Sequence, residues 1–145
     1  MLVLIRGAGD LASGVSLRLH RAGFPVVMTD LPKPTAIRRT VCFSQAIRFG
    51  TTMVEDAEGV CCHTAREVKA ALDAEKIPVL PDETAKCKDW LHPDVLVDGI
   101  LAKKNLGTKM SDAPLVIALG PGFCAGRDCH AVIETMRGHT LGRVI

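Results

Sequence analysis

The sequence predicts an α/β protein: a Rossmann-like, mostly parallel sheet with flanking helices, forming a single domain over residues 1–145. Three observations predict this fold. Residues 2–30 give a short apolar strand, a glycine turn, an amphipathic helix, a second strand and an acid, the layout of a dinucleotide-binding βαβ unit. Apolar strand-like runs then alternate with helix-like segments. A content of 48% hydrophobic and 23% charged residues is typical of a globular domain.

The glycine turn Gly7–Ala12 follows the strand predicted at Leu2–Ile5 and opens the first helix. Gly7 can adopt backbone angles that other residues avoid, and Gly9 lacks the Cβ that would keep a phosphate away from the backbone. The first turn of the helix offers unpaired N–H groups and a positive dipole end to an anion. The alternative is a turn whose glycines serve packing alone. We expect Gly7, Gly9 and Ser13 to hold a phosphate, and Ala8 to belong to the same cofactor-binding site.

Two acids belong to this unit. Asp30 follows the second strand, Val26–Met28, about 20 residues after the glycines, where a carboxylate can accept hydrogen bonds from ribose hydroxyls. Asp10 lies inside the turn, where its charge repels a phosphate unless a cation intervenes. Asp10 has two other interpretations: it caps the helix by accepting from the amides near Ala12 and Ser13, or it indicates a ligand that is not a dinucleotide.

The next segment begins with prolines, which predict an extended loop at Leu31–Pro34. Arg38 and Arg39 follow, where they either hold a 2′-phosphate or another anion, or lie on the surface of a short helix. The elements expected from there to residue 91 are a helix at Ser44–Phe49, a hairpin of Thr51–Glu55 and Val60–His63, a helix at Thr64–Glu75, a strand at Ile77–Pro81 and a helix at Asp82–Leu91.

Particular residues set the boundaries of these elements. Gly50 ends the first of the helices, and residues 56–59 form the turn of the hairpin. Thr64 and Glu67 have the spacing of a capping box. Asp82 is expected to cap the last helix, with Trp90 facing the core.

The second half of the chain supplies further site candidates. Asp98 ends a strand at Pro93–Asp98, and strand carboxyl ends line the ligand crevice of a parallel sheet. A second glycine cluster directly follows the strand Leu115–Leu119, and we expect Gly120 and Gly122 to turn backbone amides into the same crevice. Asp128 and His130 are the candidate catalytic acid and base. The chain then predicts a strand at His130–Thr135 and a C-terminal β-hairpin that returns along Leu141–Ile145.

The six cysteines raise the question of a metal site. Cys61, Cys62 and His63 are adjacent, and Cys124, Cys129 and His130 lie close together, but neither group has the C-x-x-C spacing of a zinc knuckle. We therefore predict no bound metal, and buried thiols without a reactive role.

Charge and composition exclude several classes of protein. A net charge of +2 is too small for a nucleic-acid footprint, and 3% aromatic residues leave no platform for stacking bases. There is no signal peptide, because Arg6 interrupts the apolar start, and no run is long enough to cross a bilayer. These features predict a cytoplasmic protein with reduced cysteines, without a membrane or nucleic-acid partner.

Five blocks of the sequence resemble one known family, the accessory proteins linked to selenium-dependent molybdenum hydroxylases, related by role to the maturation factors of xanthine dehydrogenase. The blocks are Arg6–Gly14, Arg38–Val41, Ala102–Thr108, Gly120–Phe123 and Asp128–His130. The resemblance implies a Rossmann-like domain and a role in maturing or supplying the molybdenum centre. It also implies a longer protein that continues beyond Ile145, because family members tend to be longer.

The leading hypothesis is an accessory factor for a selenium-dependent molybdenum hydroxylase that binds a nucleotide-containing ligand. The ligand is either NAD(P) or the nucleotide form of the molybdenum cofactor, and the protein partners are an apo-hydroxylase and a second copy of the chain. One alternative is an NAD(P)-dependent oxidoreductase with His130 or Asp128 as the proton donor. The others are a protein-binding scaffold without a ligand and a site for S-adenosylmethionine, although the spacing of the glycine turn suits a dinucleotide better.

Overall fold

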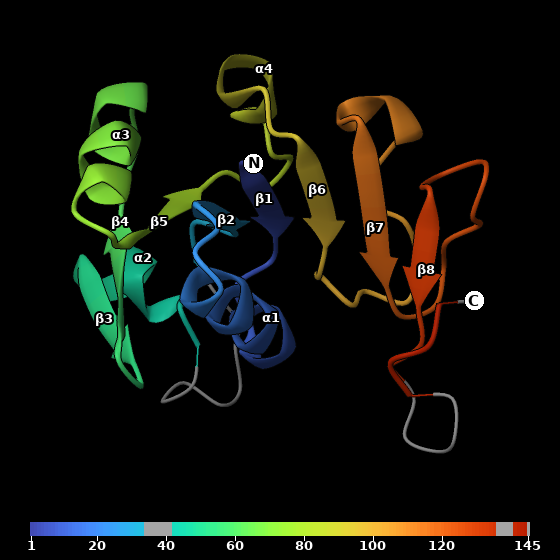
Figure 1. Ribbon diagram of the computed structural model, residues 1–145, viewed down its shortest axis with the longest axis horizontal. Helices are drawn as coiled ribbons and strands as arrows, with labels where there is room; N and C mark the ends of the chain where they lie inside the picture. The colour runs from blue at the N-terminus through green and yellow to red at the C-terminus, as the bar shows by residue number, and fades with distance from the viewer. Residues whose placement is uncertain (34–41, 136–140, 145) are drawn as a thin grey trace.

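A computed structural model describes residues 1–33, 42–135 and 141–144. Over these ranges the chain forms an eight-stranded sheet in the order β3-β4-β5-β2-β1-β6-β7-β8, with helices on both faces (Figure 1). The elements are β1 (Val3–Arg6), α1 (Asp10–Arg21), β2 (Val26–Asp30), α2 (Gln45–Phe49), β3 (Thr51–Val54), β4 (Ala57–Cys61), α3 (Ala65–Asp73), β5 (Ile77–Pro81), α4 (Lys88–Leu91), β6 (Val95–Asp98), the short 3-10 helix η2 (Met110–Asp112), β7 (Leu115–Leu119) and β8 (Ala131–Ile133).

The order of the strands confirms the predicted fold class. Six of them, β5-β2-β1-β6-β7-β8, are parallel neighbours in the order 3-2-1-4-5-6 of a dinucleotide-binding sheet. The direction of chain travel reverses between β1 and β6, where Arg6 is paired in register with Asp98. Ligands of such sheets bind outside the strand carboxyl ends at this switch point, so the fold itself indicates a ligand site at the carboxyl ends of β1 and β6.

The sheet is buried on both faces by different helices. Ile5 of β1 packs in one cluster with Ala12 and Leu17 of α1, whereas the neighbouring Leu4 packs in a second cluster with Val68 of α3. Figure 1 shows α1 on one side of the sheet and α3 and α4 on the other. This two-sided burial explains why β1 is an uninterrupted apolar run up to Arg6. Within the described ranges, no helix has the length and apolar character needed to cross a membrane.

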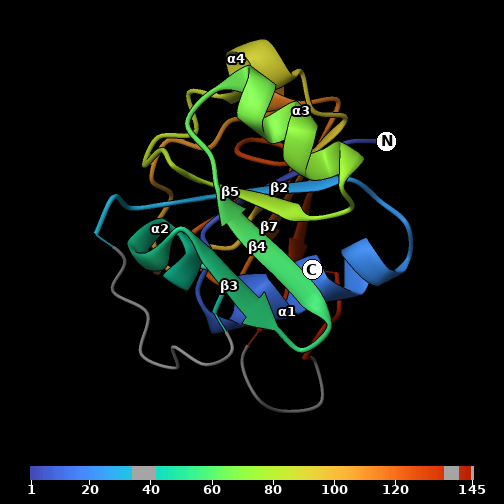
Figure 2. The same cartoon turned by 90° about the vertical axis from the view of Figure 1, so that its left-hand side faces the viewer.

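Local signals predicted the middle of the chain well. Gly50, with φ of 90°, ends α2. The Thr64 hydroxyl accepts a hydrogen bond from the Glu67 N–H at 3.2 Å, and the Glu67 carboxylate accepts from the His63 N–H at 3.1 Å, so the capping box is present. The hairpin of β3 and β4 exists, but Val54 pairs with Ala57, so its turn falls before the one predicted. Figure 2 shows this hairpin at one edge of the sheet beside α2.

The helix predicted at Asp82–Leu91 is wrong for its first half. Asp82 does act as an N-terminal acceptor, because its carboxylate takes the Lys86 and Cys87 N–H groups at 3.0 and 2.8 Å. Ala85, however, has φ of 54°, a left-handed conformation that a continuous α-helix does not contain. The α-helix is therefore confined to α4, and Trp90 is 41% exposed instead of facing the core.

The C-terminal part of the sheet uses loops where a doubly wound fold has helices. In the described residues, the connection from β6 to β7 contains only the short η2, and that from β7 to β8 contains no helix. The strand β8 is parallel to β7, with Ala131 beside Ile117. The predicted return of the chain is limited in the described residues to one antiparallel bridge, Ile133 with Val144.

Candidate functional site

A pocket of about 660 Å³ opens at the switch point. It lies at the carboxyl ends of β1, β2 and β6, the position where the sheet topology predicts a ligand. The lining residues come from the glycine turn and from the loops after β2, β5 and β6. They are Arg6–Ala12, Thr29–Leu31, Glu83, Thr84, Gly99–Leu101 and Leu106.

The two glycines of the turn, Gly7 and Gly9, have different structural roles. Gly7 has φ of +99°, and a Cβ at this position would lie 2.8 Å from the Gly99 carbonyl oxygen, so Gly7 allows the turn after β1 to pass close to the backbone that follows β6. Among the residues that the structure describes, a Cβ on Gly9 would meet nothing within 4 Å, so the backbone of Gly9 faces open space. In the described part of the chain, the N–H groups of Gly9 and Asp10 have no acceptor. They are available to an anion at the start of α1.

Asp30 lies in the pocket as predicted, and the protein already holds its carboxylate. Oδ2 accepts from the Ala8 N–H at 3.2 Å, and Oδ1 accepts from the Leu31 N–H at 2.8 Å. Burial raises the pKa of Asp30 above its usual range, and the bonds from Leu31 and Ala8 partly oppose that rise. Each carboxylate oxygen keeps a second acceptor position that can take a ribose hydroxyl.

Asp10 lines the pocket but does not cap α1 in the predicted way. Gly9 is the N-cap and Asp10 is the first residue of the helix. Among the described residues its carboxylate accepts from the adjacent Leu11 N–H, at 2.9 Å, and not from Ala12 or Ser13. A carboxylate in the first turn is favourable for the helix dipole, which gives Asp10 a structural reason to be there.

The prediction that Ser13 binds phosphate is wrong. Its side chain is fully buried and outside the pocket lining. The hydroxyl donates to the Ala8 carbonyl oxygen at 3.2 Å and accepts from the Phe43 N–H at 2.8 Å. Ser13 therefore ties the glycine turn to the segment that leads into α2. Arg38 lies outside the described residues.

Sequence reasoning missed Arg6, a buried charge in the wall of the pocket. It is only 3% exposed. Its guanidinium donates to the Thr108 hydroxyl at 2.7 Å and to the carbonyl oxygens of Leu106 at 3.0 Å and Glu83 at 3.2 Å. The available signal was a charged residue at the end of an apolar strand that had to be buried on both faces.

Asp98 was expected to touch the ligand, and the structure places it behind the pocket instead. The residue is 1% exposed and does not belong to the lining. Its carboxylate accepts from the Thr108 hydroxyl at 2.6 Å and from the Ile100 N–H at 3.2 Å. Asp98 thus shapes the loop that follows β6.

The second glycine cluster does not line the pocket either. Gly120 and Gly122 have φ of +85° and +98°. A Cβ on Gly120 would lie 2.8 Å from Cδ2 of Leu101, and one on Gly122 would lie 2.6 Å from Cα of Lys104. Both glycines allow the loop after β7 to pack tightly on the loop after β6, so their function in the structure is close approach between two loops.

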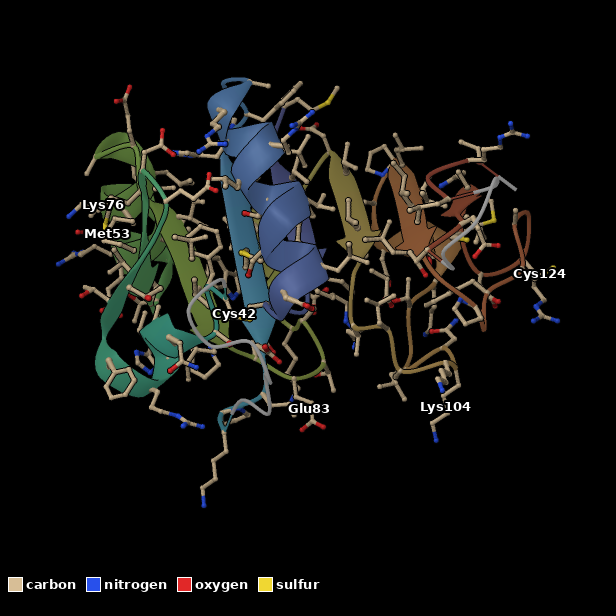
Figure 3. The ribbon with its side chains drawn as sticks, turned by 90° about the horizontal axis from the view of Figure 1, so that it is seen from below. Cys42, Met53, Lys76, Glu83, Lys104 and Cys124 are labelled. Atoms are coloured by element: carbon tan, nitrogen blue, oxygen red, sulfur yellow. The ribbon has the colours of Figure 1, made fainter. Side chains whose placement is uncertain are left out.

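The predicted catalytic pair lies away from the pocket. Asp128 accepts from the Cys124 N–H at 2.9 Å and pairs with Arg127 at 3.3 Å, contacts that hold the pKa of its carboxyl below the usual range, Arg127 most strongly. The His130 Nδ1 accepts from the Val116 N–H at 2.9 Å, near the amino end of β7. In Figure 3, Cys124 lies at the far edge of the sheet from the helix α1, whereas Glu83 and Lys104 lie on loops at one end of the sheet.

The cysteines are mostly buried, as predicted, with Cys124 as an exposed exception. Burial raises the pKa of Cys62 to about 11, so its thiol is protonated and unreactive at neutral pH. In the described ranges, no group of three or more His, Cys, Asp or Glu side chains is arranged to hold a metal ion.

The chain is similar to one curated protein along nearly its whole length. It is 54% identical over 144 residues to "Uncharacterized protein YqeB" of Escherichia coli (strain K12). The match covers 99% of this chain and 27% of the relative, so the chain spans about a quarter of the length of that protein. No family model matches the chain, and no solved structure matches it. The relative's name states no activity, so the function must be argued from the chemistry of the pocket.

Proposed function

We propose that the pocket binds a nucleotide-containing ligand and that the chain serves the maturation of a selenium-dependent molybdenum hydroxylase, in cofactor biosynthesis or insertion. The observation that supports nucleotide binding is that three features lie together at the switch point. They are an unobstructed backbone at Gly9, unpaired N–H groups at the start of α1 and a carboxylate at Asp30.

In this proposal, different parts of the pocket bind the diphosphate and the ribose of the ligand. A diphosphate accepts from the N–H groups of Gly9 and Asp10, each hydrogen bond to this charged group contributing about 1.5 kcal/mol or more net. The ribose donates its hydroxyls to the Asp30 carboxylate, which its two backbone partners already orient. The volume of about 660 Å³ is within the range of small-molecule and cofactor sites.

Two ligands satisfy this chemistry: a pyridine dinucleotide and the nucleotide form of the molybdenum cofactor. Both carry a ribose and a diphosphate, whereas S-adenosylmethionine carries no phosphate for the Gly9 amide. Mass spectrometry of the small molecule that copurifies with the chain identifies the ligand. Recovery of a compound without a nucleotide would reject the proposal.

The geometry favours an accessory role over oxidoreductase chemistry. The proton donors considered for an oxidoreductase, His130 and Asp128, do not line the pocket. Among the described lining residues there is no His, Lys, Tyr or Cys, and the titratable acids are Asp10, Asp30 and Glu83. Oxidation or reduction of a candidate substrate, followed at the absorbance band of reduced nicotinamide, would reverse this preference.

The maturation role is supported by the sequence blocks shared with the accessory proteins of selenium-dependent molybdenum hydroxylases. Its test is coexpression of such a hydroxylase with the chain, with the Gly9→Val variant and with neither. We expect a higher molybdenum content and activity of the hydroxylase only with the unchanged chain. Equal molybdenum content in all three would reject the role. A cytoplasmic site of action and a homodimer belong to the same proposal, and light scattering on the purified chain tests the dimer.

A further inference from the structure

Two loops that border the pocket come from strands on opposite sides of β1. Residues 82–87 follow β5, and residues 99–108 follow β6. Arg6 lies between them and donates through Nη2 to the Glu83 carbonyl of one loop and the Leu106 carbonyl of the other. Glu83 and Leu106 both line the pocket, so a single guanidinium connects two of its walls.

Thr108 links this guanidinium to Asp98. Arg6 and Asp98 are register partners, but they meet through the hydroxyl of Thr108, which accepts from Arg6 Nη1 at 2.7 Å and donates to Asp98 Oδ2 at 2.6 Å. The Asn105 side chain fixes the backbone of Thr108 at both its N–H and its carbonyl, at 2.7 and 2.8 Å. Thr108 itself does not line the pocket.

Stability alone does not account for a buried charge here. The Nε of Arg6 is buried and has no hydrogen-bond partner among the described residues. An unsatisfied buried donor is costly, and apolar residues of similar volume often stabilise such a position at least as well. What an apolar side chain cannot do is hold two carbonyl groups of different loops at fixed positions.

We propose that Arg6, oriented by Thr108 and Asp98, is a positioning residue that sets the spacing of the two loops and through it the affinity of the pocket for its ligand. The effect on affinity rests on the proposed function, whereas the tie between the loops does not. The proposal predicts that a change at Thr108, on one loop, alters amide exchange on the other loop and the affinity of the pocket.

The test uses a matched pair of variants. Thr108→Val keeps the shape of the side chain and removes its hydroxyl, and Thr108→Ser keeps the hydroxyl. Amide hydrogen exchange without ligand is followed at residues 85–87, whose N–H groups all bond to Asp82. We expect Thr108→Val to speed exchange there about tenfold, as for the loss of one hydrogen bond to a charged group, and Thr108→Ser to restore it.

Calorimetric titration with ADP-ribose is the second measurement. We expect about tenfold weaker binding for Thr108→Val and recovery for Thr108→Ser. Faster exchange confined to residues 99–108, a failure of Thr108→Ser to restore the wild-type values, or unchanged affinity despite faster exchange would each overturn the proposal. If Thr108→Val speeds exchange at residues 85–87 but the unchanged chain does not bind ADP-ribose, the connection between the loops would stand and the proposed function would be rejected instead. Should Thr108→Val not fold, Arg6→Lys, which keeps the charge but loses the forked geometry, replaces it, and exchange at residues 85–87 together with the affinity for ADP-ribose decides as before.

Discussion

The carboxylate of Asp30 accepts a hydrogen bond from the Ala8 N–H, with Oδ2 and N 3.2 Å apart. The acid at the end of β2 therefore holds the glycine turn at the end of β1, and the two parts of the predicted site contact each other before any ligand binds. One consequence is a correction to the expected role of Ala8: its amide is occupied, and the amides left for a phosphate are those of Gly9 and Asp10. A second consequence is that Asp30 is oriented in advance for a ribose.

The two glycines of the turn give opposite predictions for stability. Gly7→Ala forces a Cβ against the Gly99 carbonyl and puts alanine at φ of +99°, so we expect a loss of about 2 kcal/mol or more in the free energy of unfolding. Gly9→Ala meets open space at φ of −73°, so it should leave that free energy within about 0.5 kcal/mol. Urea denaturation measures both, and equal losses would contradict the different roles assigned to these glycines.

Ligand affinity should depend on pH through Asp30. The ionised carboxylate accepts the ribose hydroxyls, and burial raises its pKa, so affinity falls as the pH drops through a range higher than that of an ordinary aspartate. Titration with ADP-ribose between neutral and acidic pH measures this fall. In Asp30→Asn the affinity should be low and independent of pH over the same range. A variant that retains the pH dependence would show that another group titrates.

The Asp30 carboxylate should also discriminate against a phosphate on the ribose. In ADP-ribose with a 2′-phosphate, the negatively charged phosphate would lie beside this carboxylate and be repelled by it. We therefore expect this compound to bind at least about tenfold more weakly than ADP-ribose, a loss of about 1.4 kcal/mol in binding free energy. Competition between the two compounds measures the ratio. Tighter binding of the phosphorylated compound would instead support a 2′-phosphate contact by Arg38.

The capping box of α3 gives a prediction that is independent of the ligand. Thr64→Ala removes the acceptor of the Glu67 N–H, so the free energy of unfolding should fall by about 1 kcal/mol, while Thr64→Ser should retain most of it. Chemical denaturation of the two variants provides the comparison. An unchanged midpoint for Thr64→Ala would mean that the cap contributes nothing to the stability of the fold.

Local chemistry explains what the sequence could predict. The strand, the glycine turn, the helix and Asp30 are consecutive, and the capping box of α3 lies within four residues, so short-range patterns suffice to identify them. These patterns placed the pocket at the correct edge of the sheet. The need for a glycine at Gly7 could be predicted from the tight turn alone, without knowing that Gly99 lies beside it.

The rest depends on contacts between distant segments. Gly120 and Gly122 are needed because another loop approaches them, which no local pattern reveals. His130 was assigned to the wrong end of the sheet because the parallel strand β8 requires the chain to return to the amino ends before it. Arg6 was overlooked because its partners, Glu83, Leu106 and Thr108, are 77 or more positions away.

The affinity of the Gly9→Val variant for ADP-ribose tests the central claim most directly. The side chain added at Gly9 points into open space, so the fold should be kept while the approach of a phosphate to the turn is blocked. Calorimetry should show binding to the unchanged chain and a loss of at least about 100-fold in the variant, the loss of two or more hydrogen bonds to a charged group, at an equal denaturation midpoint. Equal affinity of the two proteins, or no binding to either, would contradict the claim that this turn holds a nucleotide.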